Sequence, residues 1–233
     1  MARTVRHSSA GYTLIEVLLV VIIIGIISSV ALKSLGKVNE TARIEETRQT
    51  LDRLAFAIAG DPSIISNGQR ASFGYVGDVG GLPPTLQALV QNPGGYTTWQ
   101  GPYIRDQFTT GGAHNSFKHD SWGNMIVYSG THELSSMSGG MILTRRFAGS
   151  VADLTLNSIT AIVTDMDHTP PGTTYRDSIR CVLTFPDGVG GTTSRTRYPD
   201  GGGRVRFDSV PIGLQDLIVV YIPLSDTLHR KVA

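Results

Sequence analysis

Apolar residues are concentrated near the start of the chain. The nineteen residues from Leu14 to Leu32 contain one charged side chain, Glu16, and most of the others are Leu, Ile or Val. An α-helix needs about 20 apolar residues to cross roughly 30 Å of hydrocarbon. The pattern therefore predicts a transmembrane helix over residues 12–31.

The residues before this run carry two arginines, Arg3 and Arg6, and no acid. By the positive-inside rule, this charge keeps the N-terminus cytoplasmic and places the body across the membrane. One interpretation is a cleaved secretory signal, with Ser29-Val30-Ala31 as its cleavage site. A plain membrane anchor is a second. Neither explains Glu16, because a carboxylate in an apolar run costs about 2–3 kcal/mol and is usually functional.

The helical pattern continues beyond the apolar run to Ala59 without a proline. Apolar residues recur there at spacings of three, four and seven, which places them on one face of a helix. These residues are Leu35, Val38, Ala42, Leu51, Leu54, Ala55 and Ile58. Gly60-Asp61-Pro62 ends the pattern. We expect one long helix over residues 12–59 whose second half packs on the body.

The start of the apolar run also carries a motif. Gly11-Tyr12-Thr13-Leu14-Ile15-Glu16 resembles the prepilin cleavage motif of type IV pilins and type II secretion pseudopilins. The resemblance implies that a prepilin peptidase cuts after Gly11 and methylates the new N-terminus at Tyr12. It further implies that Glu16 meets the Tyr12 amine of a neighbouring subunit during assembly. The family usually has Phe or Met where this chain has Tyr12.

This resemblance implies a structural subunit of a type II secretion pseudopilus or a type IV pilus-like fibre. The implied location is the bacterial inner membrane, with a single pass, a cytoplasmic N-terminus and a periplasmic body. The implied partners are the prepilin peptidase, other copies of the chain, minor pilin-like subunits and an inner-membrane assembly platform. The alternative is a membrane-tethered or secreted binding module with a β-sandwich ligand-binding domain.

The next hundred residues are predicted to form a small antiparallel sheet. Residues 66–79 are rich in Gly and are expected as a loop, and Pro84 can open a short helix. Residues 125–128 and 141–144 are predicted strands, the second following a Ser/Gly loop. We expect the helix residues Leu51, Leu54, Ala55 and Ile58 to pack against Trp122, Ile126 and Ile142.

Two aromatic turns extend the resemblance to the major pseudopilin of type II secretion. One is Trp99-Gln100-Gly101-Pro102-Tyr103-Ile104, which follows Leu82-Pro83. The other is the structural turn motif formed by Asp120, Trp122, Gly123 and Asn124. Major pseudopilins also carry an acidic calcium loop, but here only Asp153 remains as a candidate ligand, beside Arg145 and Arg146. Calcium needs six to eight oxygen ligands, so we expect no cofactor.

After Asp153, short apolar runs alternate with Gly, Pro and Asp turns. The predicted strands cover residues 159–164, 179–185, 192–198, 204–208 and 217–222. Their spacing is typical of a β-sandwich. Residues 200–213 resemble a hairpin of carboxypeptidase-regulatory-like domains. The core of this part is expected from Val163, Leu183, Val205, Phe207 and Val219.

The predicted fold class is therefore α+β: a long N-terminal transmembrane and amphipathic helix packed on a small antiparallel sheet, followed by an all-β sandwich. The predicted parts are a prepilin leader over 1–11, the transmembrane and fibre-core helix over 12–59, a pseudopilin-like domain over 60–155 and the sandwich over 156–233. Formal net charge is +1, and loss of the two leader arginines lowers it to −1. Such a balance gives no reason to expect nucleic-acid binding.

No catalytic set emerges from the sequence, and we expect no enzyme. The polar residues His114, His119, Asp120, His132 and Glu133 could meet, but they lack a metal-binding spacing. The serines of residues 135–138 lack the context of a hydrolase nucleophile. Asp165 and Asp167 are interpreted as a hydrated turn. Cys181, the single cysteine, is interpreted as a small buried apolar residue.

Overall fold

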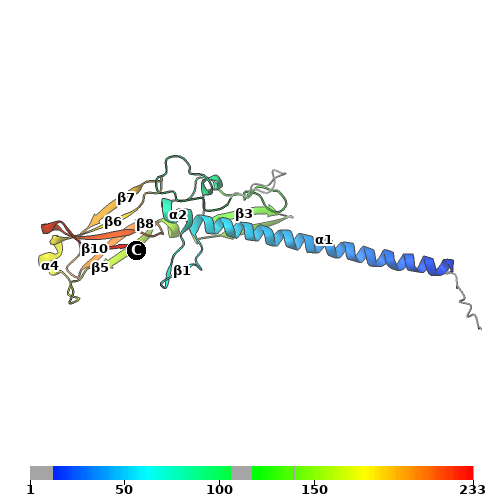
Figure 1. The fold of residues 1–233 in the computed structure, drawn as a ribbon, viewed down its shortest axis with the longest axis horizontal. Coiled ribbons are helices and arrows are strands. Elements are labelled where there is room, and N and C mark those ends of the chain that lie inside the picture. The colour runs from blue at the N-terminus through cyan, green and yellow to red at the C-terminus, as the bar shows by residue number, and fades with distance from the viewer. Residues whose placement is uncertain (1–12, 106–116, 139, 233) are drawn as a thin grey trace, which may run out of the picture. The chain divides into compact units, whose positions relative to one another are not determined.

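The computed structural model describes residues 13–105, 117–138 and 140–232. The first element is the helix α1 (Leu14–Ala59), a single helix of 46 residues (Figure 1). The chain divides into two compact units, residues 1–45 and residues 46–233, which are described separately below. Within the described residues, no helix combines the length and the apolar character that crossing a membrane requires. The transmembrane helix predicted over residues 12–31 is therefore not confirmed.

An arginine side chain caps the C-terminal end of α1. The helix stops at Gly60, whose φ of 82° suits glycine and whose N–H still donates to the Phe56 carbonyl. Two short strands follow, β1 (Ile65–Ser66) and β2 (Gln69–Arg70). The Arg70 guanidinium donates to the carbonyl oxygens of Ala59 and Gly60. A cation here satisfies carbonyls left unpaired at the helix end and complements the helix dipole.

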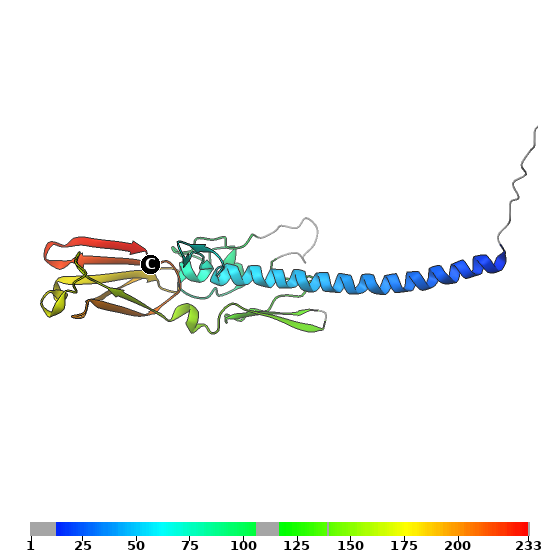
Figure 2. The ribbon, with the colours of Figure 1, turned by 90° about the horizontal axis from the view of Figure 1, so that it is seen from below.

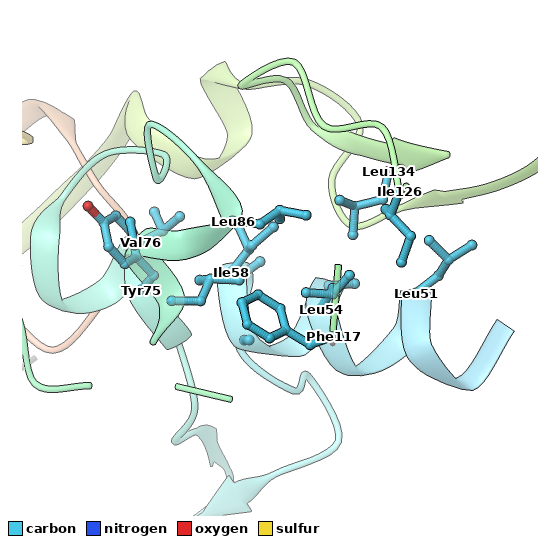
Figure 3. Packing of buried hydrophobic residues seen from close by; sticks show 14 of the residues in the cluster. Leu51, Leu54, Ile58, Tyr75, Val76, Leu86, Phe117, Ile126 and Leu134 are labelled. Atoms are coloured by element: carbon cyan, nitrogen blue, oxygen red, sulfur yellow. The ribbon is translucent and has the colours of Figure 1, made fainter. Parts of the chain in front are cut away.

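One face of the last turns of α1 is buried in the first apolar cluster. The buried positions Thr47, Leu51, Leu54 and Ile58 follow spacings of four, three and four residues. They meet the helix α2 (Gly74–Val79), the 3₁₀ helix η1 (Leu86–Leu89) and side chains from the following segments (Figure 3). The labelled partners in that view are Tyr75, Val76, Leu86, Phe117, Ile126 and Leu134.

The predicted helical stripe was only half right. Leu51, Leu54, Ala55 and Ile58 are buried as expected, whereas Leu35 and Val38 are more than 60% exposed. The burial therefore begins at Thr47. The loop predicted over residues 66–79 contains β2 and α2, and the short helix predicted after Pro84 is η1.

The two-stranded sheet beside this cluster is a hairpin of β3 (Glu133–Ser138) and β4 (Met141–Arg146). Residues 125–128 form only isolated bridges, so the strand predicted there was wrong, and β3 lies where a Ser/Gly loop was expected. Ile126 is in the core as predicted, but Ile142 is 68% exposed and Trp122 lies outside the cluster. In β4 it is Leu143, one residue along, that packs inward. Adjacent strand residues point to opposite faces of the sheet. A prediction that is wrong by one residue therefore assigns the buried side chain to the exposed face.

The remaining strands form two antiparallel sheets. One contains β6 (Ile179–Pro186), β7 (Thr192–Arg197), β9 (Asp216–Tyr221) and β10 (Asp226–Val232), in the order β10-β9-β6-β7. The other pairs β5 (Asn157–Ile162) with β8 (Arg204–Val210). Figures 1 and 2 show these strands in yellow to red. The strand β10 was not predicted.

Both sheets contribute to a second apolar cluster. Leu183, Val205, Phe207 and Val219 are buried in it, and Val163 packs against it, as predicted. The hairpin expected over residues 200–213 is wrong, because β8 pairs with β5. The structure describes six strands over residues 157–232, and the predicted β-sandwich is not confirmed.

One five-residue turn occurs four times in the described residues. In each copy the Oδ1 atom of a leading aspartate accepts the N–H groups two and four residues later, at 2.8–3.0 Å. The aspartate N–H in turn donates to the carbonyl four residues later. The fourth residue has positive φ, which favours glycine. The copies are Asp120–Asn124, Asp165–Thr169, Asp187–Gly191 and Asp200–Arg204.

Backbone hydrogen bonds tie residues near the first apolar cluster to the turn between β6 and β7 and to the segment after β8. Thr97 N–H donates to the Gly190 carbonyl at 2.7 Å, Gly188 N–H to the Val79 carbonyl at 2.9 Å and Ile212 N–H to the Leu154 carbonyl at 2.9 Å. A β-carbon at Gly190 would lie 2.1 Å from the Tyr96 ring. We call these contacts the seam.

The predicted boundaries at residues 11, 59 and 155 stay predictions.

The Gly190 contact gives a stability prediction with an internal control. Gly190→Ala should lower the free energy of unfolding by about 1–3 kcal/mol more than Gly188→Ala, because only the first substitution forces a β-carbon into Tyr96. At Gly188, with φ of 88° close to the 92° of Gly190, the nearest atom would be 3.6 Å away. Chemical denaturation followed by circular dichroism measures both variants. Equal losses would show that positive φ alone is responsible.

Candidate functional site

The first half of α1 exposes large apolar side chains at almost every position. Twelve of them lie between Leu14 and Ile27, with exposed fractions from 46% to 86%. We call this stretch the N-terminal apolar segment; its members are Leu14, Ile15, Val17, Leu18, Leu19, Val20, Val21, Ile22, Ile23, Ile24, Ile26 and Ile27. Consecutive helix positions point to all sides, so the segment has no polar face. A helix that is apolar all round requires apolar surroundings.

Glu16 is the one charged residue in this segment. It lies in the first turn of α1, where its N–H donates to the Thr13 carbonyl at 3.1 Å. A negative charge is favourable there because the helix dipole is positive at its N-terminus. Among the described residues, the Glu16 carboxylate has no ion-pair or hydrogen-bond partner. The predicted processing residues Gly11 and Tyr12 lie outside the described residues, so their roles stay predictions.

The predicted structural turn is one copy of the five-residue turn, with additional partners. Asp120 is 4% exposed. Its Oδ2 accepts the Ser136 hydroxyl at 2.6 Å and the Asn124 side-chain amide at 3.2 Å, while Oδ1 accepts the N–H groups of Trp122 and Asn124. Gly123 has φ of 85°. One buried carboxylate thus holds both the turn and strand β3.

This turn also fixes the last part of α1. Ser121 N–H donates to the Thr47 hydroxyl at 3.2 Å, and Asp52 forms an ion pair with Arg145 of β4 at 2.5 Å. Sequence reasoning missed Thr47. The signal was present, because Thr47 continues the spacing of Leu51, Leu54 and Ile58, and a polar residue at a buried position needs a hydrogen-bond partner.

The aromatic turn that begins at Trp99 packs on α2 and η1. The Trp99 indole donates to the Ala88 carbonyl and the Tyr103 hydroxyl to Asp78 Oδ2, both at 2.8 Å. Burial raises the pKa of the Asp78 carboxyl, and the Tyr103 hydrogen bond opposes that rise. Burial also raises the pKa of Tyr75 to about 12, which keeps this phenol neutral. These contacts are structural.

The metal-binding possibilities weighed from the sequence have other partners. Glu133 pairs with Arg146 at 3.1 Å, and His114 lies outside the described residues. No group of three or more His, Cys, Asp or Glu side chains suited to a metal occurs in the part of the chain that the structure describes. Asp153 Oδ2 accepts Ser150 N–H, and Asp153 N–H donates to the Ser150 hydroxyl, as in a helix capping box. The expectation for calcium remains untested.

The catalytic candidates have structural partners as well. Ser136 is bonded to Asp120, and Asp165 opens another copy of the five-residue turn. Cys181 is buried in the second cluster, and burial raises the pKa of its thiol to about 11. A thiol with this pKa is a poor nucleophile at neutral pH.

Comparison with known proteins gives one match. The family model for the prokaryotic N-terminal methylation motif covers residues 6–32. No curated protein matches the chain, and no solved structure matches it. The matched motif is that of prepilin-type N-termini, and it fits a pilin-like, structural subunit that a prepilin peptidase processes.

The burial of Asp120 gives a second prediction. Asp120→Ala should lower the free energy of unfolding by about 3 kcal/mol, because Ser136, Trp122 and Asn124 lose a charged acceptor inside the body. The control is Asp165→Ala, which removes the same aspartate from an exposed copy of the turn and should cost about 1 kcal/mol. Thermal unfolding at one pH compares the variants. A loss at Asp165 as large as that at Asp120 would contradict the bracing role of Asp120.

Proposed function

We propose that the chain is a structural subunit of a type II secretion pseudopilus or type IV pilus-like fibre. In this proposal a prepilin peptidase cuts after Gly11, and the subunit assembles through the first half of α1. The observation that carries it is the methylation motif over residues 6–32, which leads directly into an apolar segment without a covered face. The chain acts by packing and carries no chemistry of its own.

The N-terminal apolar segment supports the choice of partner. Its side chains gain free energy by leaving water, at about 25 cal/mol per Å² of buried apolar area. A second copy offers the same β-branched surface, so one sequence supplies both sides of the contact. We propose that like segments pack together in the fibre core. Before assembly, the segment anchors the subunit at the inner membrane, with the body in the periplasm.

In this proposal, Glu16 aligns each subunit with the next one in the fibre. Cleavage after Gly11 creates an amine at Tyr12, four residues before Glu16. We propose that Glu16 of one subunit pairs with the Tyr12 amine of the next, since two charges in apolar surroundings are tolerated when they neutralise each other. Minor pilin-like subunits and an inner-membrane assembly platform complete the proposed set of partners.

A tethered binding module is the second candidate, and the cavity described in the next subsection favours it. The two candidates differ in their processing. A fibre subunit loses residues 1–11 and keeps the apolar segment, whereas a tethered module keeps residues 1–11 and a secreted module released by signal peptidase loses the apolar segment.

Processing is tested on the N-terminus of the protein isolated from its host. We expect the mature chain to begin at Tyr12, with or without a methyl group on its amine, and we expect deletion of the prepilin peptidase to leave residues 1–11 attached. Intact-mass spectrometry measures both. A mature chain that begins after Ala31 would identify an ordinary signal peptide and overturn the fibre proposal.

Assembly is tested on the Glu16 carboxylate. Glu16→Ala should be cleaved normally but should lose fibre assembly, because truncating one member of a buried pair costs about 3–5 kcal/mol per subunit contact. Glu40→Ala is the matched control, since Glu40 is another exposed glutamate of α1 outside the apolar segment. Sheared-fibre yield and the extent of cleavage are measured together. Normal fibre yield from Glu16→Ala would exclude the pairing.

A further inference from the structure

A cavity of about 480 Å³ lies in the body at the seam. This volume is within the roughly 300–1,000 Å³ that small-molecule sites occupy. Its walls come from four regions: residues 71–78, the turn at 97–100, the β6–β7 hairpin, and the start of β9. The lining residues are Ala71, Phe73, Gly77, Asp78, Thr97, Thr98, Gln100, Thr184, Phe185, Pro186, Thr192, Leu214 and Asp216.

Among the described residues, the charged side chains that line this cavity are both acidic. They are Asp78 and Asp216, and no described Lys, Arg or His lines it. Tyr103 donates to Oδ2 of Asp78, which leaves Oδ1 of this half-buried carboxylate for a further donor. Burial raises the pKa of Asp78, so its negative charge is incompletely solvated. A cation beside Asp78 would relieve that cost.

Two arginines lie over aromatic rings of the cavity wall, and both are bound elsewhere. Arg70 lies over the Phe73 ring at 5.2 Å, but its guanidinium donates to the carbonyls that end α1. Arg195 lies over the Phe185 ring at 4.8 Å, and its guanidinium donates to the Asp208 carbonyl. Neither lines the cavity. Among the described lining residues, no cationic side chain complements Asp78, and a ligand that carries a cation would do so.

Thr98 supplies a second, independent sign of a ligand. Its Oγ1 atom is buried and has no hydrogen-bond partner among the described residues, although Thr98 lines the cavity. Buried hydroxyls are nearly always hydrogen-bonded, because leaving one unpaired costs about 1–3 kcal/mol. A hydroxyl oxygen accepts the same N–H donors that a carboxylate accepts.

We propose that this cavity binds a small molecule carrying an alkylammonium or alkylguanidinium group. The cationic nitrogen donates to Asp78 Oδ1 and to Thr98 Oγ1, and Asp216 also lines the cavity. The alkyl part packs on Phe73, Phe185 and Leu214. This site lies in the body and does not depend on how the N-terminal apolar segment functions.

The test uses the full chain in detergent micelles and a pair of isosteric probes. Butylguanidinium and butylurea have the same shape but differ in charge. Isothermal titration calorimetry should give saturable one-site binding of butylguanidinium and at least about tenfold weaker binding of butylurea, since a charge-assisted hydrogen bond is about twice as strong as a neutral one. Equal affinities, or no saturable binding of butylguanidinium, would overturn the proposal. Tighter binding of glucose would overturn it in favour of a neutral hydroxyl-rich ligand.

Substitutions of the lining residues test which of them contact the ligand. Asp78→Asn should weaken butylguanidinium binding at least about tenfold, and its side-chain oxygen can still accept the Tyr103 hydroxyl. Asp216→Asn tests the second acidic residue of the cavity if Asp78→Asn fails to fold. The exposed Asp167→Asn, which does not line the cavity, is the control and should bind as the unmodified chain does. Unchanged affinity in both cavity variants would exclude the site.

Thr98→Val separates a ligand contact from a structural one. Because Thr98 Oγ1 has no partner in the described structure, this substitution should reduce affinity without lowering the unfolding midpoint. A lower midpoint with unchanged affinity would overturn the assigned contact. Sedimentation with and without butylguanidinium tests the other source of a cation, a Lys or Arg side chain from a second copy. If butylguanidinium dissociates oligomers of the body, the free small molecule is the wrong assignment.

Discussion

The burial of one face of α1 is the constraint on which the body depends. Leu51, Leu54 and Ile58 are almost fully enclosed, and each contributes about 1.5–3 kcal/mol relative to an exposed side chain. The same face ends at Thr47, whose hydroxyl receives a backbone N–H from the turn after Asp120. Arg70 then closes the helix by binding its terminal carbonyls. Helix, turn and hairpin are therefore stabilised together.

The two halves of α1 form one helix but distribute their apolar side chains differently. In the second half, a narrow buried face alternates with charged residues, as a single-sided contact requires. In the first half, the apolar side chains surround the helix, so no single packing surface could cover them. A helix of this kind is incomplete as an isolated chain. Burial of such a helix requires apolar surroundings on several sides, as in the proposed fibre core.

The sequence predicted the parts of the fold that depend on apolar periodicity. Leu51, Leu54 and Ile58 were found this way, as were Leu183 and Phe207 in the alternating strands. It failed for β3, because that strand buries Ser136 through a hydrogen bond to Asp120, and a serine carries no apolar signal. The strand β10 was missed because its sequence is mainly polar. Glu16 was singled out as the one charge in the apolar run, four residues after Tyr12, and its role in assembly stays a prediction, whereas Asp78 and Thr98 come to line one cavity only through tertiary folding.

The fourfold occurrence of the five-residue turn changes how its sequence should be used to trace ancestry. Asp120-x-Trp122-Gly123-Asn124 contains the same aspartate and left-handed fourth residue as three turns elsewhere in the chain. His168 even replaces glycine in one copy. The aspartate and glycine are thus required by the conformation of the turn, which unrelated proteins can adopt independently. Evidence of common descent would lie in the long-range partners Thr47 and Ser136, which the turn itself does not require.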